Sequence, residues 1–194
     1  MNKNNITRHS LTKLILTALF TGLIVVSAQI IIPLAVPFTL QSLGIFLASG
    51  ILGWKQGMLS VALYIMLGVI GLPVFSGFQG GLGVLFGVTG GYIWGFLPTA
   101  FIVGIVCEKV SRKKSVMALA MASGLIVCYL LGTIWYSVYT STAFISALAV
   151  CVAPFLIADI AKIVVVISII KKLEKITPIK DIIKITNKEN NIVL

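Results

Sequence analysis

The sequence predicts an all-α integral membrane protein with six transmembrane helices, both termini in the cytoplasm, and a glycine-rich external loop between the third and fourth helices. Three observations predict it: the composition, the lengths of the apolar runs, and the placement of the basic residues. Of the 194 residues, 59% are hydrophobic and 10% are charged, and the mean hydropathy is +1.12. Soluble domains are about half apolar and about a quarter charged, so the composition excludes a water-soluble protein.

Six runs almost free of charge approach the length of about 20 residues that a helix needs to cross a bilayer. They cover residues 14–32, 40–53, 58–72, 90–106, 116–136 and 154–170. The sixth begins at Pro154, because proline fits the first turn of a helix. The further run 142–152 is expected to form either a short helix or an extension that precedes this proline.

The basic residues distinguish the two sides of the membrane. Fourteen of the 15 Lys and Arg residues lie in the two tails, the second loop and the fourth loop, and the alternate loops contain none. Short cytoplasmic loops collect Lys and Arg, so we place both termini in the cytoplasm and the chain in the cell membrane. This gives a cytoplasmic tail over 1–13, a membrane domain over 14–172 and a basic cytoplasmic tail over 173–194. The net charge of +10 therefore reports orientation in a lipid bilayer, and no nucleic-acid partner is expected.

Two segments keep alternative interpretations. The first run could be a secretory signal peptide cleaved after Ala28, but it is long for that role and five more spans follow it. From Thr177 onward, lysines mix with isoleucines, so the tail either lies on an anionic membrane surface or is disordered.

The chain lacks the residues that an enzyme would need. Its only histidine, His9, lies in the N-terminal tail, so no Ser-His-Asp or Cys-His arrangement can form inside the membrane. It has no phosphate-binding loop motif, and its three cysteines have no metal-ligand spacing. We therefore expect no catalytic residue, no metal and no cofactor. Uphill transport would need an ion gradient or another subunit.

Asp159 and Lys162 are charged residues well inside a predicted span. They are three residues apart, so their side chains share a helix face and can meet. A charge at the bilayer centre costs roughly 2.5–3.5 kcal/mol, so such residues normally face a cavity or one another. We interpret the pair as part of a substrate or ion site near the external mouth; the alternative is a structural ion pair.

The loop over residues 73–92 is long, uncharged and rich in glycine. Eight of the 18 glycines lie in it or just after it, and glycine lets a ligand or another backbone approach closely. Gln79, Thr89 and Tyr92 add hydrogen-bonding groups, which favours a ligand lid or wall. The alternative is close helix packing, because glycine recurs at every fourth position over residues 83–95.

Two further features carry less information. Gln41 places an amide at the external entrance of the second span. Ala18 and Gly22 form a small-xxx-small pair in the first span, which lets another helix approach closely. Internal packing and contact with a partner protein explain this pair equally well.

Taken together, these segments resemble the BioY family, the biotin-specific substrate-binding subunits (S components) of energy-coupling factor (ECF) transporters. The resemblance covers about residues 14–172 and departs from the usual family pattern at Val88, in place of proline, and at Ala158, in place of glycine. It rests on Val36-Pro-Phe-Thr-Leu-Gln-Ser-Leu-Gly44, Gly71-Leu-Pro-Val-Phe75, Gly80-Gly-Leu-Gly83, Val88-Thr-Gly-Gly-Tyr92 and Pro154-Phe155 followed by Asp159-x-x-Lys162.

The resemblance implies a six-helix subunit that captures biotin at its external face. It implies that Asp159 accepts hydrogen bonds from the ureido N–H groups, and that Lys162 donates to the ureido carbonyl or to the tail carboxylate. The other substrate-binding residues that it implies are Gln41, Gln79, Thr89, Gly91 and Tyr92, with Phe75 and Trp94 enclosing the ring.

The resemblance also implies partners: a transmembrane coupling (T) protein, which would dock on Ala18 and Gly22, and two cytoplasmic ATPases that drive import. Other hypotheses stay open beside it. One is an S component for a different vitamin, and another is a stand-alone ion-coupled transporter in which Asp159 carries the proton. A membrane-embedded enzyme or scaffold is disfavoured because the chain has no catalytic constellation.

Overall fold

The computed structural model describes residues 3–33 and 36–176, with side chains from Leu11 onward. The C-terminal segment from Thr177 and the side chain of His9 therefore lie outside the described residues. Within them the chain is mostly helical, as predicted, with one short hairpin that the sequence analysis did not anticipate. In order, the elements are α1 (Lys3–Gln29), β1 (Ile31–Ile32), β2 (Phe38–Thr39), α2 (Gln41–Val69), α3 (Leu82–Leu85), α4 (Gly90–Ile105), the π-helical turn η1 (Val106–Val110), α5 (Lys114–Thr140), α6 (Phe144–Cys151) and α7 (Leu156–Leu173).

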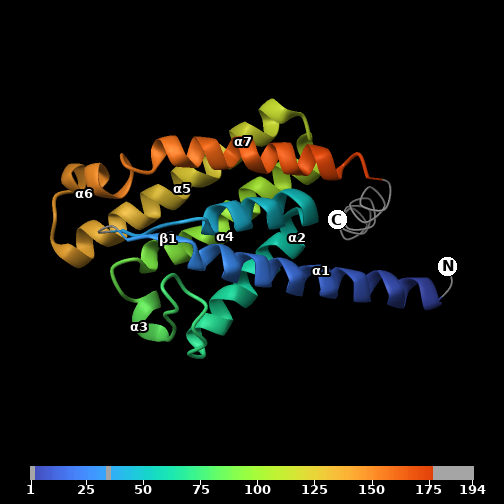
Figure 1. The fold of residues 1–194 in the computed structure, drawn as a ribbon, viewed down its shortest axis with the longest axis horizontal. Helices are drawn as coiled ribbons and strands as arrows, with labels where there is room; N and C mark the ends of the chain where they lie inside the picture. The colour runs from blue at the N-terminus through green and yellow to red at the C-terminus, as the bar shows by residue number, and fades with distance from the viewer. Residues whose placement is uncertain (1–2, 34–35, 177–194) are drawn as a thin grey trace.

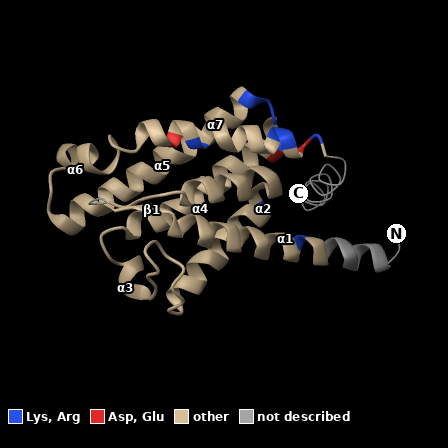
Figure 2. Ribbon diagram, viewed as in Figure 1, with Lys and Arg blue, Asp and Glu red and all other residues tan. Residues whose placement is uncertain are grey.

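The long helices run side by side along the longest axis of the molecule (Figure 1). At one end, called here the loop end, lie the β1–β2 hairpin, the glycine-rich segment 70–89 with α3, and α6. At the opposite end, called here the charged end, lie the start of α1 and the end of α7. The charged residues of the described chain gather toward the charged end, apart from one acidic and basic pair farther along α7 (Figure 2). The described chain thus has the two-sided charge distribution that the loop count predicts.

Four helices of the described chain are long and apolar enough to cross a membrane, or five if the bent pair α6–α7 forms one span. The predicted six spans differ from this count at α2, which combines the expected runs 40–53 and 58–72 in one element. That element is broken at Gly53, where φ is 79°. Its two arms, 41–52 and 54–69, are about 18 and 24 Å long at 1.5 Å per residue, and they turn back on one another at the charged end (Figure 1).

The break in α2 has specific hydrogen-bond partners. In an unbroken helix the Trp54 N–H would donate to the Gly50 carbonyl. Instead, the Trp54 N–H donates to Glu108 Oε2 at 3.2 Å, and Arg112 Nη2 donates to the Gly50 carbonyl at 2.8 Å. Buried backbone groups need such partners. Glu108 of η1 and Arg112 in the turn after it supply them, which stabilises the broken conformation of α2. Gly104 of α4 crosses the break so closely that a side chain there would meet the α2 backbone.

In the structure, the sixth predicted span is the second of two helices that meet at a bend. The run 142–152 forms a short helix, α6, which meets α7 at an angle of 50°. Pro154 lies in the turn between them, two residues before α7 begins. α7 packs on α2 and α5, and the main core joins α1, α2, α4, α5 and α7.

Candidate functional site

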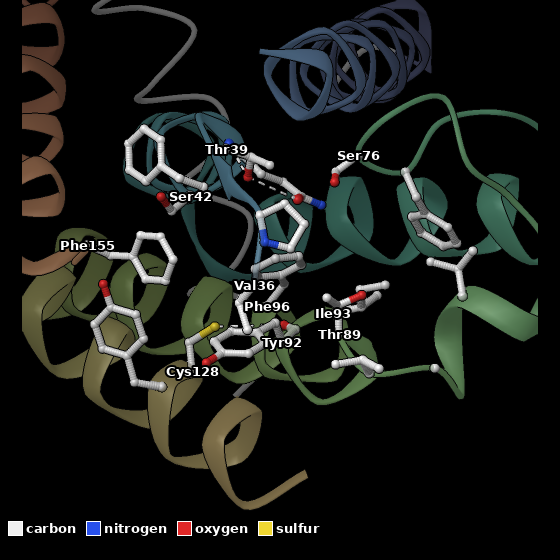
Figure 3. A pocket seen from close by; sticks show the side chains of 18 of the residues that line it. Val36, Thr39, Ser42, Ser76, Thr89, Tyr92, Ile93, Phe96, Cys128 and Phe155 are labelled. Carbon is white, nitrogen blue, oxygen red and sulfur yellow. Dashed lines mark hydrogen bonds between the residues drawn. The ribbon is translucent and has the colours of Figure 1, made fainter. Parts of the chain in front are cut away.

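A cavity of about 530 Å³ opens toward the loop end, between α2, α4, α5, α7 and the loops that join them. This volume lies in the range of small-molecule sites, which are mostly apolar with a few placed polar groups. In Figure 3, Thr39 and Ser42 lie on one wall, Tyr92 and Cys128 on the opposite wall, and Phe155 beside them. The cavity lies at the end of the molecule where the glycine-rich segment folds, and residues of that segment line it; its role as a ligand lid or wall stays a prediction.

Seven of the nine residues predicted to bind substrate line this cavity: Gln41, Phe75, Gln79, Thr89, Tyr92, Asp159 and Lys162. Gly91 and Trp94 do not line it. Gly91 packs against Trp135 of α5, and Trp94 is 40% exposed on another face of α4. Residues two apart on a helix do not share a face, so Tyr92 and Trp94 of α4 cannot both point into the cavity.

The glycine repeat over residues 83–95 divides between its two predicted roles. Gly83 and Gly87 line the cavity, whereas Gly91 and Gly95 bring α4 into close contact with α5. The first half of the repeat thus contributes to the cavity wall and the second half to helix packing.

The ion pair between Asp159 and Lys162 forms one wall of the cavity. Lys162 Nζ lies 2.6 Å from Asp159 Oδ1, and the two side chains are only 7% and 6% exposed. The same nitrogen donates to the Thr39 carbonyl at 2.7 Å and to Ser42 Oγ at 3.1 Å, and it lies 4.0 Å from the centre of the Phe38 ring. An ammonium group has three donors, so all of them are satisfied by the protein.

Asp159 is held by side chains from two other helices. Its Oδ2 accepts a hydrogen bond from the Tyr129 hydroxyl of α5, and its Oδ1 lies 3.4 Å from the Ser42 hydroxyl of α2. Neither partner was predicted from the sequence. The sequence does contain a sign of Tyr129, because it places a polar hydroxyl in the middle of an apolar run. Ser42 directly follows Gln41 in the motif over residues 36–44.

A second chain of hydrogen bonds links the two arms of α2. Gln41 Nε2 donates to the hydroxyl of the fully buried Tyr64 at 2.5 Å, and the Thr39 hydroxyl lies 3.4 Å from Gln41 Oε1. The Phe75 ring meets the Tyr64 ring edge to face, with centroids 5.5 Å apart. Phe75 is 1% exposed, so the glycine-rich loop places an aromatic ring at the base of this wall.

The remaining walls are aromatic. Phe38 and Phe155 stack with centroids 5.9 Å apart, which joins the hairpin to the start of α7. The Tyr92 hydroxyl donates to the Cys151 carbonyl of α6 at 3.3 Å. The cavity thus combines one buried charge pair with amide, hydroxyl and aromatic groups, and among the described residues no cluster of His, Cys, Asp or Glu could hold a metal ion.

Ala18 and Gly22 lie away from this cavity, on the exposed face of α1. A side chain added at Gly22 would meet no atom within 4 Å. Of the two alternatives given for the pair, internal packing finds no support among the described residues, because both positions are exposed and nothing lies against Gly22. Contact with a partner stays a prediction.

The chain is similar to known proteins over most of its length. The BioY family profile matches residues 1–179. The biotin transporter BioY of Thermotoga maritima is 44% identical over 165 residues, which cover 84% of this chain and 96% of that protein. The probable biotin transporter BioY of Pyrococcus horikoshii is 40% identical over 82% of this chain and 94% of that protein.

A crystal structure described as the S-component for biotin from an ECF-type ABC transporter superimposes with a TM-score of 0.81 and 29% sequence identity. The match covers 91% of this chain and 95% of that chain. All these relatives are named as transport proteins and none as an enzyme, in agreement with the sequence analysis. The match over most of the length and the shared fold establish that this chain belongs to the BioY family.

Proposed function

We propose that this chain is the high-affinity biotin-binding subunit of an ECF-type vitamin transporter, which captures biotin from outside the cell for ATP-driven import by a partner module. One observation carries the proposal: the Asp159–Lys162 pair is buried, 2.6 Å apart, and faces a cavity of small-molecule size. Membership of a family whose relatives are named as biotin transporters supports biotin as the ligand.

The polar groups of the cavity match those of biotin. Its ureido ring has two N–H donors and one carbonyl acceptor, and its tail ends in a carboxylate. Asp159 can accept from the ureido N–H groups, and Lys162, by exchanging one of its protein acceptors for the ligand, can donate to the ureido carbonyl or to the tail carboxylate. Gln41, Gln79, Thr89 and Tyr92 would complete the polar contacts, with Phe75 against the bicyclic ring. Gly91 and Trp94 are left out of the proposed contacts because they lie off the cavity.

The proposed orientation follows from the charge distribution. The charged end would face the cytoplasm, since Lys and Arg collect there, and the cavity at the loop end would open to the outside. In this arrangement the two arms of α2 are separate spans and α6–α7 is one bent span, which gives six spans with both termini inside.

The partner module would be a transmembrane coupling protein and two cytoplasmic ATPases. The exposed face of α1, with Ala18 and Gly22 near the exposed side chains of Ile15 and Leu19, fits an apolar helix of the coupling protein. Gly22→Leu should therefore abolish biotin uptake by cells and co-purification with the coupling protein, while the isolated subunit still binds biotin. Unchanged uptake would exclude this docking face.

Equilibrium binding of labelled biotin to the purified chain tests the proposed function. We expect tight binding by the wild type and severe loss with Asp159→Asn and with Lys162→Ala. Lys171→Ala and Glu174→Gln are matched controls, because they remove members of another ion pair on the same helix at the same spacing. No tight binding by the wild type would overturn the function, and full binding by both cavity variants would overturn the site.

Two further measurements distinguish the proposed function from the alternative functions. Competition by other vitamins would reveal a different ligand in the same cavity, and gradient-driven uptake by the purified chain in vesicles would indicate an ion-coupled transporter. Biotin amide, which lacks the tail carboxylate, identifies the group that Lys162 meets. If Lys162 binds the carboxylate, the amide loses affinity for the wild type but not for Lys162→Ala.

A further inference from the structure

Gln29, the last residue of α1, reaches across to the turn that carries Phe75. Its Oε1 accepts a hydrogen bond from the Phe78 N–H at 2.9 Å. Its Nε2 lies 3.1 Å from the carbonyl oxygens of both Val74 and Phe75. One amide side chain thus pairs with three backbone groups of a segment more than 40 residues away in the sequence.

The turn that Gln29 holds has a disfavoured backbone. It is closed by the Phe75 N–H, which donates to the Gln79 carbonyl at 2.9 Å. Gly77 and Phe78 both adopt positive φ, 72° and 58°. This region suits glycine but is costly for a bulky L-residue. The Phe78 side chain is 71% exposed, so its own burial does not stabilise this conformation.

The same turn presents residues to the cavity. Phe75, Ser76 and Gln79 line it, whereas Gly77 and Phe78 do not. The Phe75 ring packs directly over Gly68 of α2, where a side chain would leave it no room. From there it meets Tyr64, whose hydroxyl accepts from Gln41. The position of the turn therefore determines the position of the aromatic base of the cavity.

We propose that Gln29 is a positioning residue for the ligand site: its amide holds the strained turn 74–79 against α1 so that Phe75 and Gln79 face the cavity. Gln29 does not line the cavity, so it acts on the ligand only through the turn. The turn-holding role stands on the contacts above, and the effect on ligand binding rests on the proposed biotin-binding function.

The test uses two substitutions and one control in the full chain. Gln29→Ala removes all three pairings. Gln29→Glu keeps the shape and an acceptor for the Phe78 N–H but cannot donate to the two carbonyl oxygens. Val26→Ala, on an exposed position one turn earlier in α1, is the matched control. The first readout is hydrogen exchange at the Phe75 and Phe78 amides in ligand-free protein; the second is the equilibrium affinity for labelled biotin.

We expect exchange at both amides to become at least about tenfold faster in both Gln29 variants, with biotin affinity about tenfold weaker and an unchanged thermal melting temperature. Val26→Ala should match the wild type in every readout. Unchanged exchange in Gln29→Glu would overturn the turn-holding role, and faster exchange with unaltered affinity would overturn the positioning role. A wild type that binds no biotin would overturn the proposed function while the exchange readout still decides whether Gln29 holds the turn. If Gln29→Ala does not fold, Gln29→Glu alone decides both points.

Discussion

Two ion pairs on α7 share their spacing and differ in their surroundings. Asp159 and Lys162 are three residues apart with a 2.6 Å contact, and Lys171 and Glu174 are three residues apart with a 2.7 Å contact. The first pair is 6–7% exposed and faces the cavity, whereas the second is 21–28% exposed at the charged end. Spacing alone therefore does not distinguish the two pairs, whereas depth and an adjacent cavity do.

The hydrogen-bond partners of the two ion pairs support the same distinction between them. Around Asp159 and Lys162, the partners are hydroxyl, carbonyl and aromatic groups that leave the pair facing an open volume. Glu174 instead pairs with Arg112 at 2.5 Å, and Arg112 in turn donates to the Gly50 carbonyl at the break in α2. The outer pair therefore links α7 to other parts of the chain through Arg112, and the inner pair faces the cavity that is proposed to bind the ligand.

The largest expected effect comes from breaking the inner pair. Asp159→Asn should weaken biotin binding by more than about 100-fold, because it removes a charged acceptor from the ligand and leaves Lys162 buried without its counter-charge. Equilibrium binding to the purified variant measures this. Glu174→Gln makes the same chemical change in the outer pair and should alter affinity less than about twofold. Equal losses from both would erase the distinction between the pairs.

A smaller effect is expected from the hydroxyl that holds Asp159. Tyr129→Phe should weaken biotin binding by about 20-fold, the size expected for one hydrogen bond to a charged group. Tyr139→Phe is the control, since Tyr139 is 55% exposed at the edge of the same cavity. The ratio of the two dissociation constants, measured side by side, gives the contribution of the Tyr129 hydroxyl; a ratio near one would show that Asp159 needs no such support.

The outer network should affect stability and leave binding unchanged. Arg112→Gln removes the donor to the Gly50 carbonyl and the partner of Glu174, so unfolding should become easier by about 1 kcal/mol. Thermal unfolding in detergent measures this, with Lys113→Gln as a control that removes one exposed positive charge from the adjacent position. Biotin affinity that falls with Arg112→Gln would show that the two ends of the molecule are coupled.

Much of this comparison was predictable from the sequence. Apolar runs and alternating basic loops predicted the membrane helices, because bilayer thickness and charge asymmetry act directly on sequence. The depth of Asp159 and Lys162 within one run singled out the inner pair. The fusion of two runs into α2 was not predictable, since it depends on Gly53 adopting positive φ and on Glu108 and Arg112 replacing one backbone hydrogen bond.

The errors at the site have two causes. Trp94 was assigned to the site by the family resemblance, although the helical period that places Tyr92 in the cavity turns Trp94 away. Tyr129 and Gln29 were missed because their partners lie far away in sequence, at Asp159 and at residues 74–78. Contacts that depend on how distant helices pack leave little trace in a local pattern.

The smallest expected effect concerns Glu174 and pH. Burial alone raises the pKa of Glu174, but hydrogen bonds from Lys171 and Arg112 outweigh it and hold the pKa below the ordinary value of 4.5. A carboxyl whose pKa is lower in the folded state stabilises that state above pH 4.5, and the contribution disappears as the pH falls through the folded-state value. Glu174→Gln should therefore lower the melting temperature by about 1–2 °C at pH 7, equivalent to roughly 0.5 kcal/mol for a partly exposed pair. In more acidic buffer the variant and the wild type should melt together, because protonated Glu174 and glutamine are both neutral. A difference that persists unchanged at a pH where Glu174 is protonated would mean that Glu174 stabilises the helix end by packing rather than by charge.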